Sequence, residues 1–166
     1  MARRLVIFDV DETLVHATTD SLSRLPDFTV PPYGVYVRPH LNDLLEFAKQ
    51  NFDLAVWSSS ERQYVNEVAQ LLFAEHTPLK FVWAIERCVQ RPDPRTNNYV
   101  YIKDLRKVQG QGYAVENITL IDDSPEKAQR QPRNHIRVSP YGGGRDDVEL
   151  LNVRVLLQQL VERPAP

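Results

Sequence analysis

Residues 4–16 read RLVIFDVDETLVH, and this stretch decides how the rest of the chain is interpreted. Its apolar run, Leu5–Phe8, contains β-branched residues and is typical of a short buried strand. Two carboxylates follow, Asp9 and Asp11, which point to the same side of an extended chain because they lie two residues apart. The hydroxyl of Thr13 comes next. We therefore expect a polar site at the carboxyl end of a strand, where open α/β sheets bind ligands.

The acidic pair needs a compensating charge if it is buried, because burial and a like-charged neighbour both disfavour ionisation. A divalent cation with oxygen ligands supplies that charge, and Mg²⁺ suits such a site. The alternative is that Asp9 and Asp11 lie in a loop and cap the segment that follows. Taken alone, the pair leaves both interpretations open.

The composition predicts one globular domain over residues 1–166. A net charge of −2 gives no sign of a nucleic-acid-binding surface. The single cysteine, Cys88, cannot form an internal disulfide, so we expect a reducing compartment: the cytoplasm, or the nucleus if the source is eukaryotic. The first apolar run is too short for a signal peptide, and no run approaches membrane-spanning length. We expect no membrane partner, and we expect a monomer.

Predicted strands and helices alternate along the chain. Further strands are expected at 52–57, 81–85, 118–121 and 135–138. Helices are expected to begin near Pro39, at Glu61 and at Asp146. The alternation predicts an α/β fold with a mostly parallel five-stranded sheet and helices on both faces. Residues 17–36, rich in proline, predict a flap or hairpin beside the site, with an inert surface loop as the alternative.

Two further segments carry specific expectations. The helix that begins at Glu61 is expected to bury Tyr64, Val65, Val68, Leu71 and Leu72. Residues 86–98 are expected to form a polar, solvated loop. The alternative for this loop is that its arginines steer an anionic substrate; they are Arg87, Arg91 and Arg95.

Polar side chains follow other predicted strands at the same edge of the sheet. A serine run, 58–60, follows the second strand, and its hydroxyls either cap the next helix or, at Ser58, donate to a phosphate. Asp122 and Asp123 follow the fourth strand. Lys103 lies where an extended segment turns into a short helix, and on its own carries no signal. In a parallel sheet the acidic and serine clusters share the carboxyl edge.

These motifs, in this order, resemble the haloacid-dehalogenase superfamily, and within it the branch of small carboxy-terminal-domain phosphatases and NLI-interacting-factor-like phosphatases. The resemblance covers nearly the whole chain and is carried by FDVDETLVH from Phe8, VRPH from Val37, YIKDL from Tyr101 and LIDDSP from Leu120. It implies a Rossmann-like fold with a small flap and no large cap domain. Two positions depart from the pattern: Ser58 stands where threonine is frequent, and Asp123 where the small phosphatases often have asparagine.

The resemblance implies a Mg²⁺-dependent phosphomonoester hydrolase that works through an aspartyl-phosphate. Asp9 would be the nucleophile, and Asp11 would protonate the leaving oxygen and then activate water. Thr13 would fix the geometry of the loop. The substrate-binding residues would be Ser58, Ser59, Arg38 and Lys103. For Arg38 the alternative is that it anchors the start of the following helix.

The same resemblance implies a metal site at the acidic clusters. Mg²⁺ would be held by Asp9, by the backbone carbonyl of Asp11 and by Asp123. Asp122 would either bind Mg²⁺ directly or contact the residues that bind it. Both arrangements remain open at this point.

The substrate class is inferred from the missing cap. The intervals between the motifs leave room only for a flap, so the site should be open and admit a phosphorylated side chain of a protein, whether phosphoserine, phosphothreonine or phosphotyrosine. A capless phosphatase of small molecules is one alternative. A non-catalytic binding protein on the same fold is another, but the intact Asp9 and Asp11 argue against it.

Overall fold

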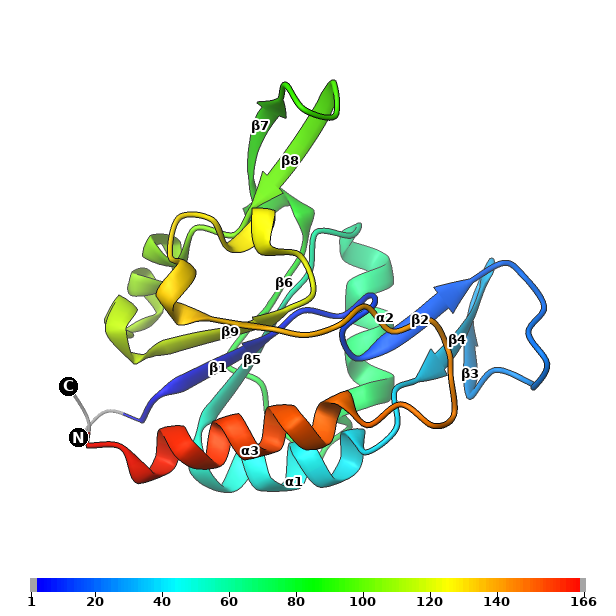
Figure 1. Ribbon diagram of the computed structural model, residues 1–166, viewed down its shortest axis with the longest axis horizontal. Coiled ribbons are helices and arrows are strands. Elements are labelled where there is room, and N and C mark those ends of the chain that lie inside the picture. The colour runs from blue at the N-terminus through cyan, green and yellow to red at the C-terminus, as the bar shows by residue number, and fades with distance from the viewer. Residues whose placement is uncertain (1–2, 165–166) are drawn as a thin grey trace.

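Five parallel strands form the centre of the protein in a computed structural model that describes residues 3–164 (Figure 1). The sheet order is β10-β9-β1-β5-β6. The strands are β1 (Leu5–Phe8), β5 (Asp53–Trp57), β6 (Val82–Trp83), β9 (Ile118–Asp122) and β10 (His135–Arg137). At the end of β1, Phe8 pairs with Val56 on one side and Ile121 on the other. The carboxyl end of β1 is therefore flanked by the carboxyl ends of β5 and β9.

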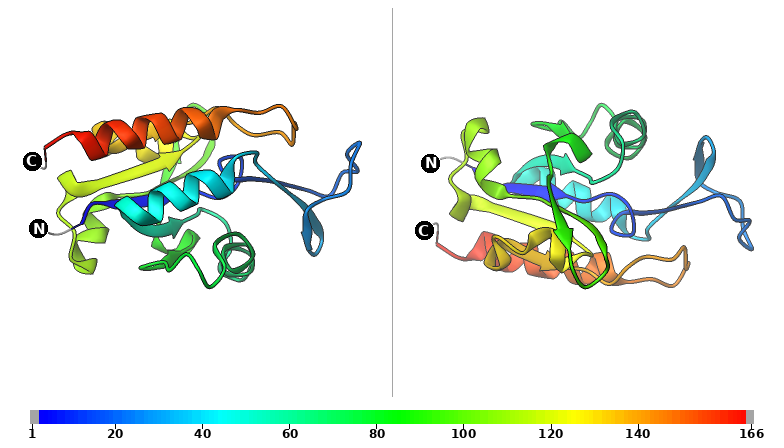
Figure 2. Two further views of the ribbon diagram at one scale, coloured as in Figure 1. Left: turned by 90° about the horizontal axis from the view of Figure 1, so that it is seen from below. Right: turned by 90° about the horizontal axis from the view of Figure 1, so that it is seen from above.

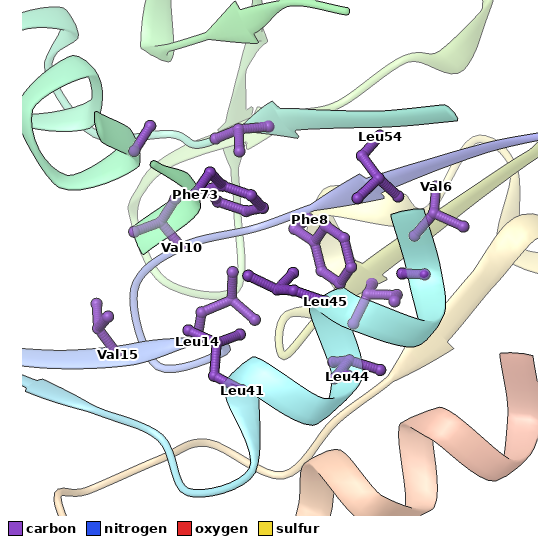
Figure 3. Close-up of a cluster of buried hydrophobic side chains, with 14 of the residues drawn as sticks. Val6, Phe8, Val10, Leu14, Val15, Leu41, Leu44, Leu45, Leu54 and Phe73 are labelled. Atoms are coloured by element: carbon purple, nitrogen blue, oxygen red, sulfur yellow. The ribbon is translucent and has the colours of Figure 1, made fainter. Parts of the chain in front are cut away.

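Three α-helices pack on one face of this sheet. They are α1 (Leu41–Asn51), α2 (Arg62–Phe73) and α3 (Glu149–Glu162). Figure 2 shows α1 and α3 side by side on that face. Figure 3 shows Phe8 between Leu45 of α1 and Phe73 of α2, and the rings of Phe8 and Phe73 lie 6.0 Å apart. Full burial of a side chain such as Phe8 contributes about 1.5–3 kcal/mol, so this cluster fixes the position of β1.

The opposite face is covered by short 3₁₀ helices. Leu5 and Ile7 point to this side because side chains alternate along a strand, and they pack with Leu105 and Val108 of η2. The 3₁₀ segments are η1 (Ile85–Arg87), η2 (Leu105–Gln111), η3 (Val115–Asn117), η4 (Pro125–Ala128) and η5 (Pro132–Asn134). The expected five-stranded parallel sheet with helices on both faces is confirmed, with 3₁₀ rather than α-helices on this face.

The flap is a three-stranded antiparallel sheet in the order β2-β4-β3 (Figure 1). Its strands are β2 (Val15–Thr18), β3 (Phe28–Val30) and β4 (Tyr33–Val37). The hairpin expected within residues 17–36 corresponds to β3 and β4. The expectation omitted β2, which leaves the acidic loop directly and pairs Val15 with Val37. The flap is therefore connected to the first motif without an intervening linker.

The expectation of a polar loop at 86–98 is wrong. Most of this segment belongs to an antiparallel hairpin of β7 (Val89–Asp93) and β8 (Asn98–Ile102), which projects away from the central sheet (Figure 1). Its strand β7 has the sequence VQRPD, in which no side chain is buried. A strand without a buried face shows no alternation of apolar and polar residues, and that alternation is the signal on which strand prediction depends.

One residue of α2 also differs from expectation. Leu71 was predicted to be buried but is 52% exposed, because the buried stripe of this helix runs through Val65, Val68, Ala69 and Phe73. Within the residues described, no helix combines the length and the hydropathy that crossing a bilayer requires.

Candidate active site

The loop after β1 is fixed by its own backbone. The N–H of Asp9 donates to the carbonyl of Ile121 at 2.9 Å, which continues the pairing of β1 with β9. The chain then turns through Glu12, whose φ of 63° lies in the left-handed region. The N–H of Leu14 donates to the carbonyl of Val10 at 2.9 Å. This tight turn places the side chains of the first motif at the carboxyl edge of the sheet.

Asp9 is 3% exposed, and both of its carboxylate oxygens accept hydrogen bonds. Oδ1 accepts from Nζ of Lys103 at 2.8 Å, and Oδ2 accepts from Oγ1 of Thr13, also at 2.8 Å. Burial by itself would raise the pKa of Asp9, but the positive charges of Lys103 and Lys127 and these hydrogen bonds hold the pKa below its ordinary value. The group at the end of β1 is therefore a carboxylate.

Lys103 follows β8 and is fully buried between two acidic side chains. Its Nζ donates to Asp9 at 2.8 Å and to Oδ2 of Asp122 at 2.6 Å. Burial would lower the pKa of Lys103, but the two carboxylates raise it above its ordinary value. Lys103 is therefore a permanent cation whose charge is already matched by its neighbours.

The acids at the end of β9 complete the cluster. Oδ1 of Asp122 accepts from the N–H of Ser124 at 2.9 Å, so both of its oxygens are engaged. Asp123 is half-buried, and its N–H donates to Oγ1 of Thr13 at 3.2 Å. Burial and the charge of Asp9 raise the pKa of Asp122, and burial with both neighbouring acids raises that of Asp123 to about 7. Negative charge is therefore under-compensated at this edge.

The donor set of this cluster fits a hard divalent cation. One carboxylate oxygen from each of Asp9, Asp122 and Asp123 lies within 4.8 Å of the other two. Carboxylate oxygens are the ligands that Mg²⁺ prefers. Both oxygens of Asp9 and both oxygens of Asp122 already accept hydrogen bonds, whereas only Oδ1 of Asp123 does, so Asp123 is the acid most available to a cation. The carboxylate of Asp11 is not part of this group, and the expected contribution of its backbone carbonyl stays a prediction.

Asp11 instead points toward the start of α2. Its Oδ1 accepts from the hydroxyl of Tyr64 at 2.5 Å, and its Oδ2 accepts from Oγ of Ser60 at 2.8 Å. Burial raises the pKa of Asp11 above its ordinary value, and the two hydrogen bonds only partly oppose this effect. The neighbouring acids Asp9 and Asp11 thus have pKa values shifted in opposite directions. Tyr64 and Ser60 were not predicted as site residues; their only signal was their position after a strand end.

The serine run forms the wall of the site beside Asp11. Ser58 is buried at the end of β5, and its Oγ accepts from the N–H of Ser60 at 3.0 Å. Its own O–H donates to no described group, so this proton is free for a ligand. Oγ of Ser59 accepts from Nζ of Lys127 at 2.7 Å. Substrate binding by Ser58 and Ser59 stays a prediction, to which their positions lend support.

Arg38 is 1% exposed and lies behind the loop of the first motif. Its guanidinium donates to both oxygens of Asp147, at 2.8 and 3.0 Å, and to the carbonyl of Thr13 at 3.1 Å. These contacts hold the loop of the first motif and do not involve the start of the following helix. Substrate binding by Arg38 stays a prediction.

Two grooves flank the acidic cluster. One, of about 420 Å³, lies between the flap and α2 and is lined by Asp11, Ser60 and Tyr64, with Tyr33 from the flap. The other, of about 690 Å³, lies between the β7–β8 hairpin and η4. No separate cap domain covers the cluster among the residues described.

Solved structures share this architecture. The chain superposes with a TM-score of 0.65 on "The Structure of Fcp1, an essential RNA polymerase II CTD phosphatase", at 21% identity, over 98% of this chain and 51% of that one. It superposes with a TM-score of 0.54 on a putative β-phosphoglucomutase from Thermotoga maritima, at 14% identity, over 91% of each chain. These likenesses confirm the expected haloacid-dehalogenase-like fold.

Sequence comparisons point to one family. A "Probable C-terminal domain small phosphatase" of Dictyostelium discoideum is 28% identical over 96% of this chain and 51% of its own length. A human "CTD small phosphatase-like protein" is 29% identical over 91% of this chain and 54% of its own. The chain thus spans about half the length of these relatives. The profile of the NLI interacting factor-like phosphatases matches residues 4–165. The chain belongs to the NLI interacting factor-like phosphatase family.

Proposed function

We propose that this chain is a Mg²⁺-dependent phosphomonoester hydrolase that acts on phosphorylated proteins through an aspartyl-phosphate. The observation that carries the proposal is the pair of acids at the end of β1. Asp9 is held as a carboxylate by Lys103 and Thr13, while the pKa of Asp11 is raised. Two adjacent acids in such different environments suit a nucleophile and a general acid–base, respectively.

In the first step, a carboxylate oxygen of Asp9 attacks phosphorus while the bond from phosphorus to the leaving oxygen breaks. Asp11 gives its proton to that leaving oxygen. Tyr64 and Ser60 fix the position of the Asp11 carboxyl group by their hydrogen bonds. In the proposed mechanism, attack and proton donation are therefore carried out by different side chains.

In the second step, water attacks the phosphorus of the aspartyl-phosphate. Asp11, now ionised, accepts a proton from this water, and the bond between phosphorus and Asp9 breaks to release inorganic phosphate. Lys103 remains beside Asp9 and balances its charge as it is regenerated. Ser58, with its unused hydroxyl proton, would donate to a phosphoryl oxygen.

The residues that would hold Mg²⁺ are Asp9 and Asp123, with the backbone carbonyl of Asp11, while Asp122 supports them through Lys103. When bound, the ion neutralises negative charge on the phosphoryl group. The raised pKa values of Asp122 and Asp123 support this assignment, because burial and repulsion between the acids raise them and a cation would offset both effects.

The proposed substrate class rests on the open site and on family membership. The grooves on either side of the acidic cluster give an extended chain room on both sides of the phosphorylated residue. The similar Fcp1 structure, whose title calls that protein an RNA polymerase II CTD phosphatase, supports a protein substrate as well.

The test is hydrolysis of p-nitrophenyl phosphate with and without Mg²⁺, followed by kcat/KM for phosphopeptides and for phosphorylated metabolites. We expect Mg²⁺-dependent turnover and a preference for phosphopeptides. No turnover of any phosphomonoester with Mg²⁺ present would overturn the proposal. A phosphometabolite preferred by several orders of magnitude would replace its substrate class with small molecules.

A further inference from the structure

Lys127 is a second lysine at the site, and none of the sequence motifs accounts for it. It lies in η4, just after the acidic motif at the end of β9, and is half-buried. Its Nζ donates to Oγ of Ser59 at 2.7 Å, a contact between residues 68 positions apart in the chain. Its ammonium therefore lies beside the serine run that lines the candidate active site.

The backbone of η4 is hydrogen-bonded to the backbone of Lys103. The carbonyl of Lys127 accepts from the N–H of Lys103 at 2.8 Å, and the N–H of Lys127 donates to the carbonyl of Ser124 at 3.1 Å. These two bonds connect η4 to the end of β8 and to the acidic motif. Lys127 is consequently held at a fixed position relative to Asp9 and Lys103, instead of belonging to a loose surface segment.

The ammonium of Lys127 is not paired with an acidic side chain in the described part of the chain. Lys103 is bonded to two carboxylates, but among the residues described Lys127 forms no ion pair with any carboxylate. An ammonium has three donors, and the bond to Ser59 uses one of them. Two donors therefore remain for a ligand, on a side chain that forms no ion pair with a described carboxylate.

The same charge acts on the reacting groups. Burial is the largest influence on the pKa values of Asp9, Asp11 and Asp123, and the charge of Lys127 lowers all three. A phosphomonoester carries about −1.5 to −2 charges at pH 7, so its binding beside these acids needs positive charge beyond that of Lys103. Lys127 also lines the groove beside the β7–β8 hairpin, together with Ser59, and is therefore accessible from outside.

We propose that Lys127 is a further substrate-binding residue, which donates directly to an oxygen of the phosphoryl group that is transferred. This inference rests on the proposed phosphatase function and adds to its phosphoryl-binding residues. In the absence of substrate the ammonium is held on Ser59. When substrate binds, one of its two remaining donors bonds to a phosphoryl oxygen as a charge-assisted hydrogen bond.

The competing explanation is that Lys127 only supports the serine run through Ser59. The two roles differ in what happens when the charge is removed but most of the length of the side chain is kept. We therefore compare Lys127→Met and Lys127→Gln with Lys127→Arg, which keeps a donor and a charge. Ser59→Ala removes the hydroxyl contact but leaves the ammonium in place. Lys107→Met is the matched control, because Lys107 is exposed and its Nζ donates to a carbonyl of Arg87.

The readouts are the affinity for inorganic phosphate by calorimetry in the presence of Mg²⁺ and the KM for p-nitrophenyl phosphate. Removing one charge-assisted hydrogen bond should weaken both by about ten-fold or more in Lys127→Met and Lys127→Gln. Lys127→Arg should recover most of the affinity, and Ser59→Ala should lose less than Lys127→Met. Lys107→Met should match the wild type. Thermal unfolding of every variant establishes that it is folded.

Unchanged phosphate affinity in a folded, uncharged Lys127 variant, with an active wild type, would overturn this inference and leave the proposed function standing. A double variant, Ser59→Ala with Lys127→Met, that loses no more affinity than Ser59→Ala alone would also overturn it, because Lys127 would then act only through Ser59. A wild-type protein without any phosphatase activity would instead overturn the proposed function.

Discussion

The hydroxyl of Tyr64 donates a hydrogen bond of 2.5 Å to Oδ1 of Asp11. This contact connects the first turn of α2 to the acidic pair at the end of β1. Tyr64 also meets the flap, since its ring lies 5.7 Å from that of Tyr33 in an edge-on arrangement. The position of the proposed general acid therefore depends on α2 and, through Tyr64, on the flap.

Replacing Tyr64 with phenylalanine should lower kcat by about ten-fold, because the carboxyl group of Asp11 loses one of its two fixed partners. The ring and its packing remain, so the thermal unfolding temperature should change little. The measurement is steady-state turnover of p-nitrophenyl phosphate beside a thermal melt. Wild-type kcat in Tyr64→Phe would show that Ser60 alone positions Asp11.

Replacing Asp9 with asparagine should reduce kcat by at least about a thousand-fold, since an amide cannot act as the attacking oxygen. The variant should still fold, because Lys103 keeps its bond to Asp122. Circular dichroism and a phosphatase assay test both statements. Asp20→Asn, at an exposed position of the chain, is the control. A folded Asp9→Asn protein with near-normal rates would contradict the mechanism.

Removing the metal should abolish activity reversibly. EDTA should stop turnover and added Mg²⁺ should restore it, because the acids at the end of β1 and β9 would otherwise repel a phosphate. Asp123→Asn should remain active but need about ten-fold more Mg²⁺ for half-maximal rate, since an amide oxygen is a neutral and weaker ligand. The measurement is rate against Mg²⁺ concentration. Full activity after exhaustive chelation would rule out the metal site.

The ion pair between Arg38 and Asp147 should stabilise the protein by an amount that depends on pH. Burial opposes ionisation of Asp147, but the bonds from Arg38 hold its pKa below its ordinary value. A lowered pKa means that the stabilisation is complete above about pH 4 and is lost as the pH falls through the folded-state pKa. Asp147→Ala leaves the buried guanidinium unpaired and should cost about 3 kcal/mol at pH 7.

Denaturant unfolding at pH 7 and at low pH measures this effect, with the neighbouring exposed Asp146→Ala as the control. The difference between wild type and Asp147→Ala should shrink at low pH, where the wild-type carboxyl group is itself protonated. A difference that is independent of pH would mean that Asp147 stabilises the protein by packing and not by its charge.

The flap should matter more for large substrates than for small ones. Tyr33 is 39% exposed and lines the groove that contains Asp11. Tyr33→Ala should lower kcat/KM for a phosphopeptide more than for p-nitrophenyl phosphate, because only the larger substrate reaches the flap. Measuring both substrates on one preparation tests this. Equal losses would indicate that Tyr33 acts only by supporting Tyr64.

Much of the frame of this site was predictable from local sequence. The strand Leu5–Phe8 and the acids that follow it are specified by a short apolar run and by the two-residue period of extended chain. The acids after β9 and the serines after β5 follow from the same reasoning. Alternating strands and helices then predict that these groups meet at one edge, because parallel strands all end there.

Which side chains are in contact could not be predicted from local sequence. Lys103 reaches Asp9 across 94 positions, Tyr64 reaches Asp11 across 53, and Arg38 reaches Asp147 across 109. A lysine, a tyrosine or an arginine is ordinary in its own segment, and only packing shows which of them is buried against a carboxylate. For the same reason no sequence motif pointed to Lys127, and the role of Arg38 could not be decided from its motif.

The sequence by itself determined the order of the strands along the chain, the acidic edge and the family resemblance, because these depend on residue type and short spacing. Tertiary structure decided which charges are matched and which are not. Lys103 is neutralised by two acids, whereas Lys127 meets only a hydroxyl. Burial and distance set the strength of each electrostatic contact, and both are properties of the folded chain.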